Sequence, residues 1–205
     1  ANLEDANLLG ARLEDARLDN VHWGHYVMQE KMARKSSDPA ARQDYLEQAE
    51  EVYRNLRRVL ENEGLFEQAG YFFRREMVMR RYQMPYYSVR RFVSRMVDLF
   101  CGYGERPLRI MFFSVFLIFG FAVAYFLNGV NDGGKLVKFS PDLPLYENAE
   151  NFFNALYFSV VTFTTLGFGD ITPSGWSRLF AGAEAFIGSF TLALFVVVFV
   201  KKMTR

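Results

Sequence analysis

TTLGFGD, residues 164–170, is a short segment with two glycines inside the apolar C-terminal half of this 205-residue chain. Apolar runs lie on both sides of it, so it belongs at membrane depth rather than in a surface loop. Irregular backbone is tolerated at that depth only where it is buried in protein or lines a water-filled cavity. The segment therefore predicts a cavity inside the membrane that is lined by main chain.

Two flanking runs are long enough to cross a membrane. Residues 110–127 carry no charge and reach roughly 27 Å as a helix, and residues 179–200 reach roughly 33 Å. Arg106 and Arg109 stand before the first run, and two lysines follow the second. Because basic residues favour the cytoplasmic side, we expect a multi-pass protein of the cell membrane with both termini in the cytoplasm.

A third apolar run, residues 151–165, leads directly into the glycine segment. At roughly 22 Å as a helix it is too short to span, so we expect it to enter the membrane and return. The C-terminal end of its dipole would then lie near the bilayer centre, where its partial negative charge favours a cation.

The order spanning helix, re-entrant helix, TTLGFGD, spanning helix resembles the tetrameric potassium channels of the two-transmembrane type, over residues 106–203. The family's filter pattern T-(V/I/L)-G-(Y/F)-G-D is met in full. The resemblance implies that backbone carbonyls and one threonine hydroxyl replace the water shell of K⁺. Alternate left-handed residues would turn successive carbonyls to one axis, and glycine permits that conformation cheaply. The matching residues are Thr165, Leu166, Gly167, Phe168, Gly169 and Asp170, with K⁺ expected at the first four.

The same resemblance assigns residues that support the filter. Tyr157 and Phe158 stand where many members carry an aromatic cuff, and the Tyr157 hydroxyl is expected to reach Asp170. Phe168 lacks the hydroxyl of the commoner tyrosine, which removes one cuff hydrogen bond. Some bacterial members have a buried glutamate where this chain has Val161, which puts their style of filter inactivation in doubt here. The full supporting set is Thr164, Asp170, Tyr157, Phe158, Val161 and Glu184. Glu184 is included on physical grounds, because an ionisable group inside a spanning run is expected to face the re-entrant helix rather than lipid.

The second spanning run contains a candidate hinge and gate. Gly188 matches the family's hinge glycine, although a glycine there also permits close helix packing. Leu192, Val196 and Val200 follow at four-residue steps on one face, where they would line the inner cavity and a hydrophobic gate.

The first 25 residues repeat with a period of five. A small apolar residue recurs at one position of each five-residue unit and a large apolar residue at another. This pattern suits a solenoid better than a helix. The segment resembles the pentapeptide-repeat family, whose units wind a square β-helix. Residues 1–25 make about one coil, so we expect a short β-solenoid-like piece of a longer array or one that packs on its neighbours. A short amphipathic helix is the alternative. The two phases are Ala1, Ala6, Ala11, Ala16 and Leu3, Leu8, Leu13, Leu18.

Residues 38–84 predict a helical hairpin in the cytoplasm. Asp38 followed by Pro39 is a helix start, and Gly64 separates two helical patterns. The unit resembles a single tetratricopeptide repeat, although a plain α-hairpin explains the pattern as well.

Residues 86–104 predict an amphipathic helix at the membrane surface. One face is apolar, and Arg90, Arg91 and Arg95 are expected to point toward anionic headgroups. The alternative is a soluble, solvated helix. Any gating input, from a regulator still to be identified, would enter from the N-terminal side through this segment.

Composition limits the other function classes. The net charge of +1 gives no reason to expect a nucleic-acid partner, and one cysteine and two histidines supply no thiol-rich metal site. Neither LGFGD nor NDGGK has the spacing of a phosphate-binding loop. The sequence also offers no serine nucleophile with a histidine and an aspartate that would activate it. We therefore expect no enzyme and no organic cofactor.

The predicted fold is a mainly α membrane protein that assembles as a homotetramer. Its predicted function is that of a potassium-selective channel, with K⁺ as the permeant ion. The predicted partners are further copies of the same chain and membrane lipids, including anionic ones. A membrane-tethered repeat or interaction protein, and a weakly selective cation channel, are the alternatives.

Overall fold

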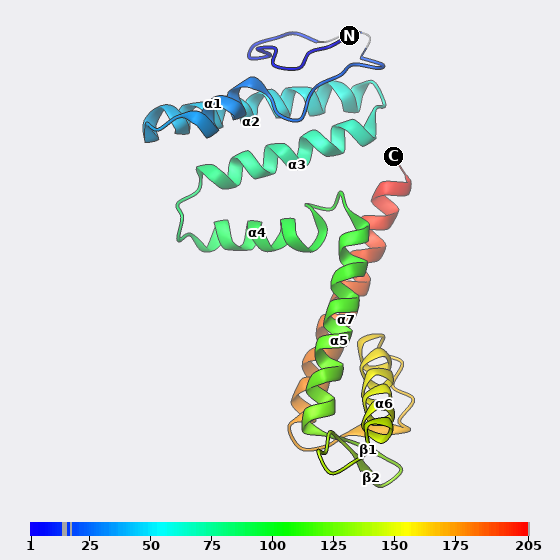
Figure 1. Cartoon of the computed structure of the whole chain (residues 1–205). Coiled ribbons are helices and arrows are strands. Elements are labelled where there is room, and N and C mark those ends of the chain that lie inside the picture. The colour runs from blue at the N-terminus through cyan, green and yellow to red at the C-terminus, as the bar shows by residue number, and fades with distance from the viewer. Residues whose placement is uncertain (14–15, 17, 205) are drawn as a thin grey trace. The chain divides into compact units, whose positions relative to one another are not determined.

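The computed structural model describes residues 1–13, 16 and 18–204. The chain divides into two compact units, residues 1–106 with 202–205 and residues 107–201. Both units are built mainly from helices, and the first precedes the membrane-helix candidates in the sequence (Figure 1).

The first 25 residues wind around once before the first helix. Turns recur at five-residue steps, with Ala6, Ala11 and Ala16 each donating to the carbonyl three residues earlier. The coil closes where Asn2 pairs with His22 in a parallel bridge. Glu14, Asp15 and Arg17 of the predicted repeat segment lie outside the described residues. Membership of the pentapeptide-repeat family stays a prediction.

Three helices form the body of the first unit: α1 (Met28–Lys35), α2 (Pro39–Asn62) and α3 (Phe66–Gln83). The Asp38 carboxylate caps α2 by accepting from the backbone N–H groups of Ala40 and Ala41, as its position before Pro39 predicts. α2 and α3 pack along each other, which gives the helical hairpin. The α1 helix was not predicted, because it is short and carries only a few apolar residues.

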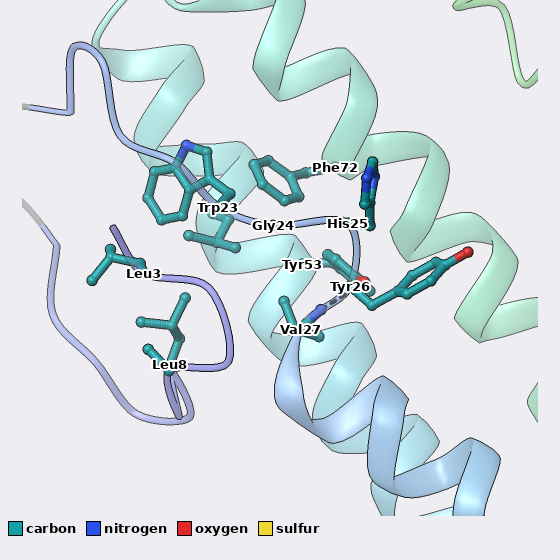
Figure 2. A pocket seen from close by; sticks show the side chains of 11 residues that line it. Leu3, Leu8, Trp23, Gly24, His25, Tyr26, Val27, Tyr53 and Phe72 are labelled. Carbon is teal, nitrogen blue, oxygen red and sulfur yellow. Dashed lines mark hydrogen bonds between the residues drawn. The ribbon is translucent and has the colours of Figure 1, made fainter. Parts of the chain in front are cut away.

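A charged cluster is buried beside this hairpin core. Glu30 of α1 is 1% exposed, accepts a hydrogen bond from the Tyr53 hydroxyl at 2.7 Å, and pairs with Arg34 and Arg75. Its neighbourhood includes the hollow drawn in Figure 2, where Trp23 and Phe72 meet edge to face and the leucines of the first coil close one side. That hollow has no room for a water-sized molecule, so it is packed core and not a ligand site.

The fourth helix, α4 (Val89–Cys101), is shorter than the predicted segment of residues 86–104. It ends at Gly102, which adopts a left-handed conformation with φ of 56°. It lies beside α3 (Figure 1), and its Asp98 accepts from Arg74 and Arg81 of α3, each at 3.0 Å.

The second unit contains three helices and a small sheet. α5 (Pro107–Asn128) and α7 (Ser177–Met203) are long and apolar enough to cross a membrane, and few of their residues are buried in the single chain. α6 (Leu145–Phe163) packs along α5 (Figure 1). It begins six residues before the predicted run, because its first turns are polar and the Asn148 side chain bonds to the Ser140 and Leu143 carbonyls.

A three-stranded antiparallel sheet joins these helices, in the order β2 (Lys135–Val137), β1 (Val130–Asp132), β3 (Ile171–Pro173). In the hairpin turn, Gly133 and Gly134 both have positive φ, at 52° and 95°. Two such residues are what the tight turns of hairpins require. The sheet was not predicted. It links the strand that follows residues 164–170, the candidate filter segment, to the strand that follows α5, with Ile171 opposite Asp132.

Candidate pore and selectivity filter

The backbone of residues 164–170 alternates in handedness. Thr165, Gly167 and Gly169 have φ of 59°, 59° and 81°, whereas Leu166 and Phe168 are not among the residues with positive φ. An L-residue with a side chain disfavours the left-handed region, so Thr165 holds a strained conformation while the two glycines do not. Alternation of this kind is the geometry that turns successive carbonyls toward one side of the strand.

The carbonyls of this segment have no backbone partner. Within the described part of the chain, no backbone hydrogen bond is accepted by a carbonyl of residues 165–169. Residues 165–170 are also exposed in the single chain. Backbone acceptors in a membrane protein need partners, since an unsatisfied group in hydrocarbon costs several kcal/mol. An ion that completes them, with further chains to exclude lipid, would supply those partners.

The C-terminus of α6 ends just before the filter segment and is held by α7. A Cβ atom on Gly188 would lie 2.1 Å from the Phe163 carbonyl oxygen and 2.9 Å from its carbon. Both atoms belong to backbone, which cannot give way as a flexible side chain would. Close packing is therefore the role that this geometry favours for Gly188, the alternative to the hinge.

The predicted cuff residues divide between two environments. The Tyr157 hydroxyl donates to the Asp170 carboxylate at 2.8 Å, and both side chains are exposed in the single chain. Phe158 is instead buried within the unit, where its ring meets that of Tyr125 edge to face. Val161 is buried too, and Thr164 bonds back to the Val160 carbonyl at 2.7 Å.

Replacing Tyr157 by phenylalanine should raise the pKa of Asp170. The hydrogen bond from Tyr157 lowers that pKa below its ordinary 3.8, so the tether is present at neutral pH and is lost as pH falls through the lowered value. In Tyr157→Phe the carboxyl should protonate at a higher pH, measured by carbon NMR of labelled aspartate. Tyr146→Phe removes an exposed tyrosine that donates to Glu147 on the same helix, and serves as the control. An unchanged Asp170 titration in Tyr157→Phe would contradict the tether.

Glu184 is turned into the protein rather than toward lipid. Its side chain is 0% exposed, accepts from the Tyr125 hydroxyl of α5 at 2.6 Å, and contacts the Ser159 hydroxyl of α6. Sequence reasoning found Glu184 but missed both partners, because a single tyrosine and serine in apolar helices carry no pattern of their own.

The predicted cavity-lining residues are exposed on the single chain. Leu192, Val196 and Val200 are 39%, 58% and 50% exposed. They follow at four-residue steps along α7, so they share a face that is open to further copies or to water. Their role as a gate stays a prediction.

The three arginines predicted to face lipid do not share one environment. Arg90 and Arg95 are exposed beside the apolar side chains of α4, among which Val89 is 77% and Phe92 64% exposed. Arg91 differs from the prediction, since its guanidinium donates to the Met84 carbonyl at 2.9 Å. It points back to the segment before α4 rather than outward.

The family match to known proteins falls mainly on the second unit. Residues 111–205 match the family model Ion_trans_2, described as "Ion channel". The match begins within α5 and includes α6, the filter segment and α7. Residues 111–205 are therefore similar to ion-channel domains. This match, together with two helices long and apolar enough to cross a membrane, supports the prediction of an ion channel for this part of the chain.

A curated relative is similar to part of the chain. Protein LctB of Bacillus caldotenax is 34% identical over 80 residues, which are 39% of this chain and 59% of LctB. The match thus spans less than two thirds of the length of that relative. No solved structure matches the chain.

Proposed function

We propose that four copies of this chain form a potassium-selective channel in the cell membrane, with both termini in the cytoplasm. The observation that carries the proposal is the alternation of left-handed residues at Thr165, Gly167 and Gly169, which leaves a row of carbonyls without backbone partners. Such carbonyls can replace the hydration shell of K⁺.

Fourfold assembly follows from the same row of carbonyls without backbone partners. One chain supplies one filter strand, which can surround an ion on one side only. The exposed filter residues and the exposed face with Leu192 and Val196 would then be covered by neighbouring copies. A homotetramer places four Thr165 hydroxyls and four sets of carbonyls around one axis.

Ion uptake into liposomes tests the proposal. The purified chain is reconstituted with K⁺ inside, and entry of Rb⁺, a close substitute for K⁺, is followed with and without a Na⁺ gradient. Rapid Rb⁺ entry with little Na⁺ entry is the expected result. Equal Na⁺ entry would identify the weakly selective cation channel, and no flux with a monomer in detergent would favour the membrane-tethered interaction protein.

The first unit provides a route for regulation. Asp98 of α4 is bound by Arg74 and Arg81 of α3, with exposed side-chain fractions of 13%, 22% and 11%. The chain continues from α4 into α5 through residues 102–106 only. A regulator that moved the hairpin would therefore pull on α4, and through that short link on the first spanning helix. Arg90 and Arg95 would bind anionic headgroups in the same arrangement.

Asp98→Asn should loosen α4 from the hairpin. Burial alone would raise the pKa of Asp98, but the hydrogen bonds from Arg74 and Arg81 outweigh it and lower the pKa. The attachment is therefore present at neutral pH and lost as pH falls through that lowered value. Removing one partner of a largely buried pair costs on the order of 3 kcal/mol.

Hydrogen exchange of the α4 amides in the full chain measures this loosening. We expect faster exchange in Asp98→Asn and no change in the control Asp44→Asn, which alters an exposed aspartate of α2. Unchanged α4 exchange in Asp98→Asn would mean that the ion pairs do not hold the helix.

A further inference from the structure

Three short contacts meet around Glu184, and they need three hydrogens. The Tyr125 hydroxyl lies 2.6 Å from Oε2 of Glu184. The Ser159 hydroxyl contacts Oε1 of Glu184 and lies 2.8 Å from the backbone carbonyl of Ile118 in α5. A serine hydroxyl has one proton, whereas an ionised carboxylate and a backbone carbonyl only accept.

An ionised Glu184 leaves this cluster one hydrogen short. Tyr125 and Ser159 supply two protons for three contacts. If Ser159 donates to Glu184, its lone pairs face the Ile118 carbonyl at 2.8 Å, and if it donates to Ile118 they face the carboxylate. Either arrangement puts two acceptors against each other. A proton on Oε1 removes the conflict, because Glu184 then donates to Ser159, and Ser159 donates to Ile118.

The surroundings of Glu184 also favour the neutral form. Its side chain is 0% exposed in the single chain, and lipid or further copies can only add cover. Among the described residues no ion pair joins it to a lysine, arginine or histidine; Tyr125 is the titratable group that faces it from α5, and Ser159 the polar one from α6. Burying an unpaired carboxylate is far more costly than burying a hydrogen-bonded neutral acid.

We propose that Glu184 is held as a protonated acid in a hydrogen-bond relay that runs from Tyr125 through Glu184 and Ser159 to the Ile118 carbonyl, fastening all three helices of the pore domain. Glu184 acts as a positioning residue and does not touch the permeant ion. The relay requires only the ion-channel domain and stands apart from the choice of K⁺.

The relay works together with the close contact at Gly188. Glu184 and Gly188 are one turn apart on α7, and their partners Ser159 and Phe163 are one turn apart on α6. α7 thus contacts α6 at two successive turns. The second contact is with Phe163, the last residue of α6. These two contacts together set the position of the α6 C-terminus, from which the filter segment starts.

Infrared difference spectroscopy of the reconstituted full chain tests the protonation directly. At neutral pH, wild type minus Glu184→Gln should show the carbonyl stretch of a protonated carboxylic acid. Wild type minus Glu47→Gln, which removes an exposed glutamate of α2, serves as the control and should show carboxylate bands. Carboxylate bands in the Glu184 difference would overturn the proposal.

Assembly of the variants provides the second readout. Glutamine is neutral and keeps both functions, since its amide N–H₂ can donate to Ser159 and its oxygen can accept from Tyr125. Glu184→Gln should therefore assemble and conduct at the wild-type level. Glu184→Ala leaves two buried hydroxyls without this partner, which should lower the assembled fraction tenfold or more.

The comparison of the two variants decides the outcome. If Glu184→Gln impairs assembly as strongly as Glu184→Ala, the charge of the carboxylate is needed and the relay is wrong. Neither readout depends on ion preference, so a channel that passes Na⁺ and K⁺ equally would refute the proposed selectivity and leave the relay intact.

Discussion

Replacing Gly188 by alanine is expected to abolish conduction and to weaken assembly. The new Cβ would stand 2.1 Å from the Phe163 carbonyl oxygen, so α7 and the α6 C-terminus must separate by well over an ångström to reach ordinary contact. Overpacking of this kind costs about 1–3 kcal/mol per chain, or more where backbone must move. The displaced residue is the one before the filter segment begins, so the filter is expected to shift with it.

Gly182→Ala is the matched control for this experiment. Gly182 lies on the same helix, and a Cβ there would meet nothing within 4 Å. Alanine in place of a helical glycine should even stabilise the helix by about 1 kcal/mol. Both variants remove one flexible glycine from α7, and only Gly188→Ala creates the clash.

Native mass measurement and Rb⁺ flux together separate packing from hinging. The packing role predicts fewer assembled particles and no flux for Gly188→Ala, with wild-type behaviour for Gly182→Ala. If Gly188→Ala assembles fully and merely opens less often, Gly188 is a hinge and the packing account is wrong.

Gly169→Ala is expected to destroy the preference for K⁺ over Na⁺. Gly169 has φ of 81°, and its Cβ would meet nothing within 4 Å, so the penalty is conformational rather than steric crowding. An L-residue in the left-handed region costs roughly 1–2 kcal/mol, enough to turn the carbonyl away from the axis in each of the subunits. The K⁺/Na⁺ permeability ratio should fall by at least about tenfold, since 1.4 kcal/mol corresponds to a factor of ten.

Gly175→Ala provides the same backbone strain outside the filter. Gly175 has φ of 51° in the turn between β3 and α7, and its Cβ position is also open. The Gly175→Ala channel should lose some stability and keep its preference for K⁺ over Na⁺. Bi-ionic reversal potentials measure both variants. A Gly169→Ala channel that still prefers K⁺ would show that left-handed backbone at this position is not required.

The sequence predicted the backbone handedness of the glycine segment because its constraints are local. Two glycines at alternate positions, placed between apolar runs, already require alternating backbone handedness, and the structure has positive φ at Gly167 and Gly169. The two spanning runs were found for the same reason, since length and lack of charge decide them without any knowledge of tertiary contacts.

Features that depend on pairing between distant residues were missed. The sheet joins residues 130–137 to 171–173, across the whole of α6. Its turn sequence NDGG was considered only as a phosphate loop, although two adjacent glycines after an aspartate are a hairpin signal. Likewise the partners of Glu184 come from two other helices, 59 and 25 residues away in sequence.

The α4 helix shows where periodicity misleads. The apolar face of this segment and the arginines on its other face predicted a surface helix with three outward basic residues. Arg91 instead bonds to the Met84 carbonyl, and Asp98 holds the polar face to α3. A helical pattern reveals which side is apolar, but not which polar residues have partners on a neighbouring helix.

The most direct test of the account is ion density in an experimental structure of the detergent-solubilised full chain, determined once in K⁺ and once in Na⁺. We expect a fourfold axis with K⁺ density between the carbonyls of Thr165, Leu166, Gly167 and Phe168, and loss or rearrangement of that density in Na⁺. An assembly without fourfold symmetry, or the same filter density in both ions, would contradict it.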